Sequence, residues 1–245
     1  MSNLIHIVCS AARVASLAAT LAILTGCGAI VGSAPASQVR IVTVSPDAPR
    51  VDIYQGPNAL AHNLGFGTVT SYIPLSPGSD TIAANTAGTR QLLSAVKTNF
   101  ASSGQYTVLI GNAAANMQQL TLTDQSQPAP PGEIALRFID QATRIGATDI
   151  YLVPAGQKFT TVAPLVTNFL FGGNTGYLNI PTGTYSLVML STGNSPSSGI
   201  AAPYTSPQVS YSAGSAHTVI LIDQQLASTP GLQVITASDF DPVTN

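Results

Sequence analysis

The stretch that decides the fold is V-R-I-V-T-V-S-P-D-A-P-R-V-D-I-Y, residues 39–54, because a second copy of it occurs later in the chain. Residues 136–151 read L-R-F-I-D-Q-A-T-R-I-G-A-T-D-I-Y, so Arg40 aligns with Arg137 without a gap. Each copy places a turn-forming segment between two short runs rich in β-branched residues, a pattern typical of consecutive strands. A repeat of this kind predicts two units with one strand plan.

Further landmarks follow in the same order in both copies. Each copy continues with a Phe-Gly pair, a tyrosine, a turn that ends in glycine, and a β-branched run. The matched segments are Phe66-Gly67 with Phe171-Gly172, Tyr72 with Tyr177, Pro77-Gly78 with Thr182-Gly183, and residues 104–110 with 214–221 after a one-residue slip. Landmarks that keep their order are hard to obtain by chance.

We therefore expect an all-β protein of two tandem immunoglobulin-like antiparallel β-sandwich domains. The first domain is predicted at 38–125 and the second at 134–240, with a proline-rich linker at 126–133 and a short tail at 241–245. The strands expected in the first copy are 39–44, 51–54, 71–75, 106–110 and 120–123.

One segment of the first copy favours a helix instead. Residues Thr89–Thr98 are predicted to form a short helix, although nothing caps it well. The counterpart in the second copy, Ser191–Ser206, is rich in Pro, Gly and Ser and is predicted to be a loop.

The N-terminus indicates export. Residues 1–26 have the anatomy of a signal peptide, with Arg13 ahead of an apolar run at Val14–Leu24. This run is shorter than the about 20 residues that a membrane-spanning helix needs. We predict that the leader is removed and that residues 27–37 form a flexible tether.

A lipid anchor is predicted at the end of the leader. Leu24, Thr25 and Gly26 precede Cys27 in a pattern that resembles the bacterial lipobox, which implies that Cys27 becomes an acylated N-terminus. Several acyl chains hold a protein firmly at a membrane, at about 0.8 kcal/mol per buried CH₂ group. Gly28 is not the aspartate of an inner-membrane retention signal, so we expect the outer membrane of the cell envelope.

The composition excludes one class of partner. Charged residues make up 7% of the chain, against about 25% in a typical globular protein. The formal net charge is −2, and the eight Lys and Arg residues are scattered singly. Nucleic-acid binding requires clustered basic side chains, so no nucleic-acid partner is expected.

The segment 39–54, followed by L-G-F-G-T-V-T-S-Y-I-P-L-S-P-G at 64–78, resembles a family of exported bacterial proteins, the domain of unknown function numbered four-three-nine-seven. The motif S-P-D-A-P at Ser45–Pro49 is distinctive, whereas the second copy departs from it with Q-A-T-R-I at Gln141–Ile145. The resemblance implies envelope lipoproteins or secreted proteins with immunoglobulin-like sandwiches. It implies no activity.

Three aspartates are the candidates for carboxylate chemistry. Asp47, Asp52 and Asp149 lie at or beside predicted bends, where aspartate commonly accepts hydrogen bonds from turn amides. We predict this structural role, with pairing of Asp52 to Arg40 as an alternative; a catalytic carboxylate pair is the competing hypothesis. No metal site or cofactor is expected, and Ser94-Ala95-Val96-Lys97 matches the S-x-x-K pattern of serine acyltransferases without the rest of that signature.

Tyrosines at repeated positions are the candidates for binding. Tyr54 and Tyr72 recur as Tyr151 and Tyr177. Such aromatics commonly belong to the core, and the alternative is a platform for sugars. The function predicted from the sequence is a lipid-anchored, non-enzymatic module for binding, adhesion or scaffolding, with carbohydrate or another envelope protein as partner. The alternatives are a carboxylate-dependent glycan-processing enzyme and a purely structural envelope protein without a specific ligand.

Overall fold

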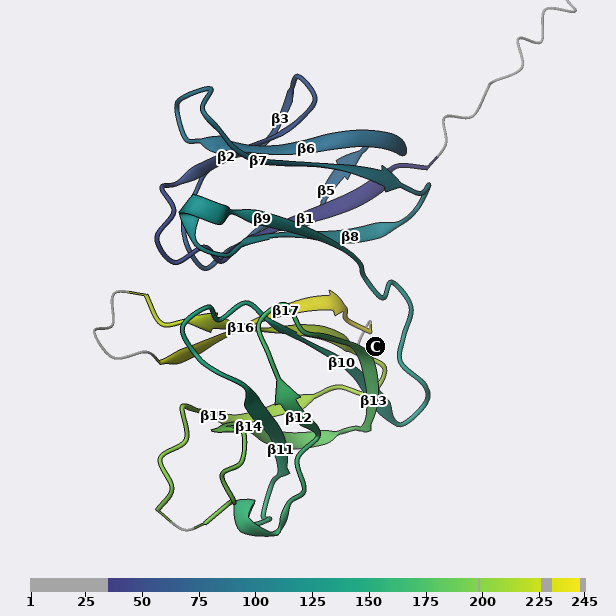
Figure 1. The fold of residues 1–245 in the computed structure, drawn as a ribbon. Coiled ribbons are helices and arrows are strands. Elements are labelled where there is room, and N and C mark those ends of the chain that lie inside the picture. Colours follow the sequence, from purple (N-terminus) through teal and green to yellow (C-terminus); the bar gives the residue numbers. More distant parts are fainter. Residues whose placement is uncertain (1–34, 198, 226–230, 243–245) are drawn as a thin grey trace, which may run out of the picture. The chain divides into compact units, whose positions relative to one another are not determined.

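The computed structural model describes residues 35–197, 199–225 and 231–242, most of which lie in short strands (Figure 1). The predicted signal peptide, the lipobox residues Leu24–Cys27 and all but the end of the predicted tether lie outside the described residues. The strands of the first half are β1 (Ser37–Thr43), β2 (Val51–Gln55), β3 (Asn58–Leu64), β4 (Thr68–Val69), β5 (Ile73–Leu75), β6 (Gly78–Thr86), β7 (Leu92–Phe100), β8 (Gln105–Gly111) and β9 (Gln118–Thr123).

The second half repeats this series. Its strands are β10 (Glu133–Asp140), β11 (Thr148–Pro154), β12 (Val166–Phe169), β13 (Asn174–Pro181), β14 (Gly183–Ser191), β15 (Tyr204–Tyr211), β16 (Ala216–Asp223) and β17 (Leu232–Phe240). Two 3-10 turns, at Ala114–Asn116 and Phe159–Thr161, are the helical elements of the described residues. None of these helical elements is long and apolar enough to cross a membrane.

The strands form four sheets, two in each half (Figure 1). In the first half, sheet A has the order β4-β1-β8-β9, with β5 also paired to β1, and sheet B has the order β3-β2-β6-β7. In the second half, sheet C has the order β13-β10-β16-β17 and sheet D the order β12-β11-β14-β15. The two halves therefore share one strand plan, and the predicted all-β fold is confirmed.

One strand pair in each half is parallel. β1 runs parallel to β8 with Arg40 opposite Thr107, and β10 runs parallel to β16 with Arg137 opposite Thr218. The remaining pairs of the described strands are antiparallel. The repeated arginines thus occupy the same place in the two halves.

Each half is a sandwich with its own core. In the first sandwich, residues 37–124, Ile41 of sheet A packs in one apolar cluster with Ile53 of sheet B. In the second sandwich, residues 133–240, Phe138 of sheet C packs in one cluster with Ile150 of sheet D. Apolar side chains at alternate strand positions create these cores, because successive side chains point to opposite faces of a sheet.

A third apolar cluster joins sheet A to sheet C. It contains Val42 and Leu109 from sheet A together with Ile139 and Ile220 from sheet C. Sheets A and C are consequently buried on both faces, which explains the nearly continuous burial of β1 and β10. The sheets stack in the order B, A, C, D, so among the described strands the outer faces of B and D are the faces that no other sheet covers.

The predicted helix at Thr89–Thr98 is wrong. Leu92–Phe100 forms β7 and pairs with β6 along nearly its whole length. Phe100 is buried and Leu93 packs against the core, whereas Lys97 and Asn99 are exposed. Pairing with β6 outweighs a helix preference that no cap supports.

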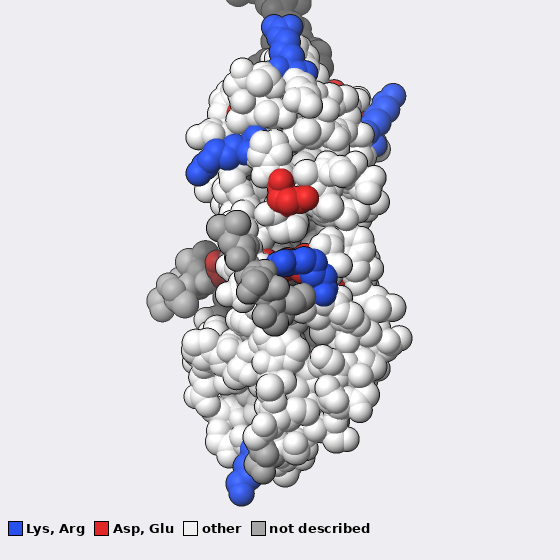
Figure 2. Space-filling model, turned by 60° about the vertical axis from the view of Figure 1, so that its left-hand side comes forward, with Lys and Arg blue, Asp and Glu red and all other residues white. Residues whose placement is uncertain are grey.

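Charges are sparse on the surface, as the composition requires. Figure 2 shows one face on which Lys, Arg, Asp and Glu appear as isolated patches among uncharged residues. Such a surface offers hydrogen bonds and apolar contacts far more than electrostatic attraction.

Candidate functional site

The outer face of sheet B is open and carries small side chains at its centre. Tyr54 of β2 lies opposite Ala83 of β6, which lies opposite Ala95 of β7. Asn85 occupies the next outward position of β6, opposite Asp52. Ile82 and Ala84 point the other way, into the core.

A groove lies on this face, and we refer to it as the Tyr54 groove. Its volume is about 340 Å³. The residues that line it are Tyr54, Gly56, Pro57, Ala83, Asn85 and Arg90. One wall is the two-residue turn between β2 and β3, which needs the left-handed backbone of Gly56 (φ +53°), and another is the 87–91 turn between β6 and β7.

Three polar groups of the groove have no hydrogen-bond partner among the described residues. The Asn85 Oδ1 atom is buried and accepts no hydrogen bond. Neither the Tyr54 hydroxyl nor the exposed Arg90 guanidinium bonds to a described residue, although the Tyr54 ring contacts His62 edge-on at 6.1 Å. A buried acceptor without a donor costs free energy that a bound hydroxyl would recover.

Asp52 holds the turn that carries Arg90. Its carboxylate accepts hydrogen bonds from the amides of Gly88 (2.9 Å) and Asn63 (2.8 Å). The same two amides lower the pKa of Asp52, with a smaller contribution from nearby His62. Asp52 therefore carries a negative charge on the same face of sheet B as Tyr54 and links the 87–91 turn to β3.

The corresponding face of the second sandwich is covered. Tyr151, Val188 and Leu190 take the places of Tyr54, Ala83 and Asn85 and are 3%, 6% and 0% exposed. Phe159 and Ile200, from the longer loops that follow β11 and β14, pack over them. Sheet D therefore carries a second small core where sheet B carries a groove.

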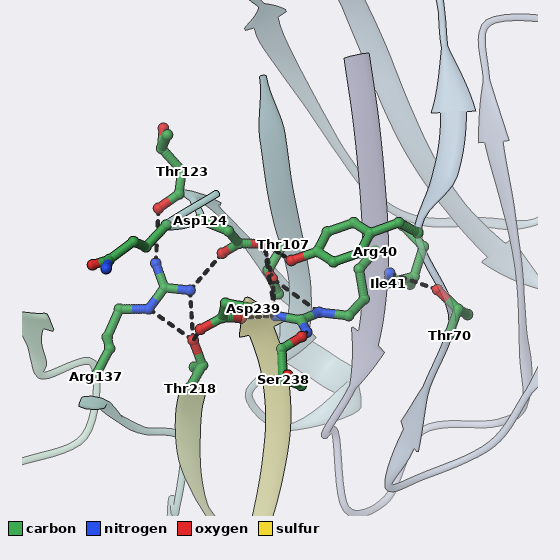
Figure 3. A network of polar contacts seen from close by, with 12 residues as sticks. Arg40, Ile41, Thr70, Thr107, Thr123, Asp124, Arg137, Thr218, Ser238 and Asp239 are labelled. Carbon is green, nitrogen blue, oxygen red and sulfur yellow. Dashed lines mark hydrogen bonds and ion pairs between the residues drawn. The ribbon is translucent and has the colours of Figure 1, made fainter. Parts of the chain in front are cut away.

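A buried polar network joins the two sandwiches (Figure 3). Arg40 of the first sandwich forms an ion pair with Asp239 of the second and donates to the Ser238 carbonyl at 2.7 Å. It also donates to Thr107 Oγ1 of its own sandwich at 2.7 Å. The arginine thus crosses from one sandwich to the other.

The second arginine makes the reciprocal contacts. Arg137 forms an ion pair with Asp124 of the first sandwich at 2.5 Å and donates to the Thr123 carbonyl at 3.0 Å. It also donates to Thr218 Oγ1 at 2.7 Å. The side chains of both arginines are 3% exposed and those of their aspartate partners are fully buried. The contact is self-complementary, as in a two-fold symmetric dimer.

Tyr72 and Tyr177 belong to this network and do not face an open surface. The Tyr72 hydroxyl donates to Asp124 and the Tyr177 hydroxyl to Asp239, each at 2.8 Å. Burial, followed by the charge of these aspartates, raises the pKa of both tyrosines. Each ring also stacks on the arginine of its own sandwich.

The remaining aspartates are engaged in local hydrogen bonds. Asp47 accepts from the Ala114 amide at 2.8 Å, and Asp149 accepts from the Asn168 amide at 2.8 Å and from Thr192 Oγ1 at 2.7 Å. Asp52 does not pair with Arg40, because Arg40 is engaged at the contact between the sandwiches. Among the described residues, no group of three or more His, Cys, Asp or Glu side chains is placed to hold a metal ion.

The S-x-x-K match lies on a strand. Ser94 and Lys97 are three residues apart in β7, so their side chains point to opposite faces of sheet B. Ser94 Oγ accepts a hydrogen bond from Gln119 at 2.9 Å. This geometry does not bring a lysine to a serine nucleophile.

The sequence does not reveal several residues that the structure brings together. Arg90 lies in the segment predicted to form a helix and no strand is expected around Asn85, so the sequence does not predict the groove. Asp124 and Asp239 are equivalent residues of the two sandwiches: each lies two residues after the partner of the repeated threonine, Leu122 in β9 and Ala237 in β17. The repeated arginines are the signal that points to them, because a buried arginine requires a carboxylate partner.

Comparison with known proteins finds a family model that matches part of the chain. Comparison with curated proteins gives no match. Among solved structures, the chain is similar to CBMbc, a family 26 carbohydrate-binding module (CBM26) of Amy13K from Eubacterium rectale, solved in complex with maltoheptaose. That similarity has 13% sequence identity and a TM-score of 0.27, and it covers 85% of this chain and 98% of that chain. Residues 37–151 match the model of the family described as "Domain of unknown function (DUF4397)".

Proposed function

We propose that the protein is a non-enzymatic binding module of the bacterial cell envelope, which holds a saccharide in the Tyr54 groove. The observation that carries this proposal is the difference between the two outer faces. The same face is open over Ala83 in the first sandwich and sealed over Val188 in the second. Two loops close one face, and short turns leave the other accessible.

The chemistry of the groove fits a sugar ring. A pyranose has an apolar C–H face, which stacks on an aromatic ring such as Tyr54, and hydroxyl groups, which donate and accept hydrogen bonds. Asn85 Oδ1 is a buried acceptor in need of such a donor. The small side chain of Ala83 leaves room for the ring, and binding sites commonly combine apolar lining with a few convergent polar groups.

The proposed location rests on the N-terminal sequence. Residues 24–27, Leu-Thr-Gly-Cys, end a leader with signal-peptide anatomy. Acylation of Cys27 would attach the chain to a membrane through its N-terminus, with the residues that precede β1 as the tether. We propose the outer membrane, because Gly28 follows the cysteine.

A glycan-processing enzyme is less consistent with the carboxylates. Asp52 and Asp149 lie in different sandwiches, and backbone amides engage both. Glycoside hydrolysis requires two carboxyl groups on either side of one bond, about 5 to 10 Å apart. The groove residues include no carboxylate.

Co-sedimentation of the full chain in detergent with peptidoglycan, outer-membrane fractions and extracellular polysaccharide tests the proposal. We expect saturable retention on a glycan fraction, reduced about tenfold in affinity by Tyr54→Ala, which corresponds to about 1.4 kcal/mol. The matched control is Phe171→Ala, which removes an exposed aromatic side chain of the second sandwich. Equal loss with both variants, or no retention on any glycan, would contradict the proposal.

A further inference from the structure

Arg90 differs from the other arginines among the described residues. Arg40, Arg137 and Arg144 lie beside aspartates, and Arg50 donates to the Asn63 carbonyl at 2.9 Å. Arg90 has no ion pair or hydrogen bond with a described residue, yet it lines the Tyr54 groove. A guanidinium in a groove without a carboxylate partner can hold an anionic group of a ligand.

The position of Arg90 is fixed by its turn. The Thr86 amide donates to the Gln91 carbonyl at 2.9 Å, and this hydrogen bond closes the turn that contains Arg90. The Gly88 amide is bound to Asp52 at 2.9 Å. The guanidinium is therefore presented from an ordered backbone, and its own side chain alone must be ordered when a ligand binds.

Two acidic groups near the groove are already engaged. Asp52 accepts hydrogen bonds from two backbone amides and lies 3.5 Å from His62 Nδ1. Asp80, near Gly56, accepts a hydrogen bond from the Thr81 amide at 2.7 Å. Neither carboxylate is paired with Arg90. The guanidinium charge is therefore available to an anionic group of a ligand.

We infer, building on the proposed function, that the ligand is an acidic saccharide whose carboxylate is bound by Arg90. The sugar ring stacks on Tyr54, and one ring hydroxyl donates to Asn85 Oδ1. The carboxylate accepts hydrogen bonds from the guanidinium, whose planar fork matches a carboxylate in a bidentate arrangement. Arg90 thus selects a negatively charged ligand, and Tyr54 and Asn85 recognise its sugar ring.

Binding of polygalacturonate and of its fully methyl-esterified form to the full chain tests this assignment. The two polymers share the sugar ring and differ in the carboxylate charge. We expect the acidic polymer to bind about tenfold more tightly, and Arg90→Gln to remove that preference without weakening the ester. Tyr54→Ala should weaken both polymers. The control Lys158→Gln removes an exposed charge of the second sandwich.

The outcomes separate the two proposals. Equal affinity for the two polymers, with no effect of Arg90→Gln, would overturn the acidic preference and leave the sugar-binding function standing if Tyr54→Ala still weakens both. Binding of both polymers that Tyr54→Ala does not change would overturn the groove as the site and both proposals with it. Loss of the acidic preference at high salt, together with the Arg90→Gln effect, would support the ion pair.

Discussion

The outer faces of sheets B and D show how one strand plan gives two different surfaces. Tyr54 and Tyr151 occupy equivalent positions, but their neighbours are Ala83 in the first case and Val188 in the second. The first face ends in short turns, and the second is covered by Phe159 and other apolar residues of two longer loops. Outward strand positions together with loop length decide whether such a face is a groove or a core.

The inner faces, by contrast, are nearly identical. Arg40 and Arg137 make reciprocal contacts, to which Arg40 adds an ion pair with Asp124 at 3.6 Å. Thr107 and Thr218 donate to Asp124 and Asp239 at the same distance, 2.6 Å. The shared inner face binds the two sandwiches to each other and leaves the outer faces free to differ. Substitutions at the inner and outer faces should separate these two roles.

The largest effect is expected at the shared face. Arg40→Ala and Arg137→Ala should each lower the free energy of unfolding by about 3–5 kcal/mol, because each removes the nearest charge partner of a buried aspartate. The two effects should be similar because the contacts are reciprocal. Urea denaturation measures both, and Lys158→Ala serves as the exposed control. Losses below about 1 kcal/mol would show that the network contributes little.

A smaller effect should distinguish the outer faces. Leu190→Ala removes a fully buried side chain from the cover of sheet D and should cost about 3 kcal/mol of stability. Asn85→Ala, at the equivalent position of sheet B, should leave stability unchanged or raise it slightly, because it removes a buried acceptor without a partner. Similar losses for both variants, measured by thermal or urea unfolding, would remove the distinction between covered and open faces.

The smallest effect concerns pH. Burial, with a smaller contribution from Asp223, raises the pKa of Asp140 to about 6, against an ordinary value of 3.8. The folded chain therefore takes up this proton before the unfolded chain does, so the contribution of Asp140 to stability rises as the pH falls from 7 towards 4. Asp140→Asn should raise the free energy of unfolding at pH 8 by about 1 kcal/mol and flatten that rise.

Asp52 of the first sandwich should behave in the opposite way. Backbone amides lower its pKa, so its contribution to stability is present at neutral pH and is lost as the pH falls through the folded-state pKa.

The exposed Asp47 provides a control for the Asp140 prediction, as Asp47→Asn should not reproduce the gain in stability of Asp140→Asn at pH 8. An equal gain in the free energy of unfolding for Asp47→Asn and Asp140→Asn would show that the effect comes from net charge and not from burial of Asp140.

The sequence predicts the all-β class because alternation is strong where one strand face is buried. The expected strands at 51–54 and 106–110 lie within β2 and β8. In β1, apolar residues occupy both faces, with Ile41 towards sheet B and Val42 towards sheet C. Periodicity reports that both faces are buried, but it does not identify the surface that buries them.

The groove could not be predicted for a related reason. Its residues come from β2, from the turn that follows β2, from β6 and from the turn before β7, and the sequence around β7 favours a helix. Without the pairing of β6 with β7, nothing places Arg90 near Tyr54. Tyr54 was expected as a repeated aromatic residue, but its surroundings depend on Ala83 and Asn85 across the strand pair.

The most direct test of the central claim is amide hydrogen exchange of the full chain, with and without the glycan that it retains. The Tyr54 groove predicts slower exchange in β2, in β6 and in the turn at 87–91, with no change in β11 and β14. Protection confined to the second sandwich, or absent around Tyr54 at saturating glycan, would contradict the assignment of the open face of sheet B as the binding surface.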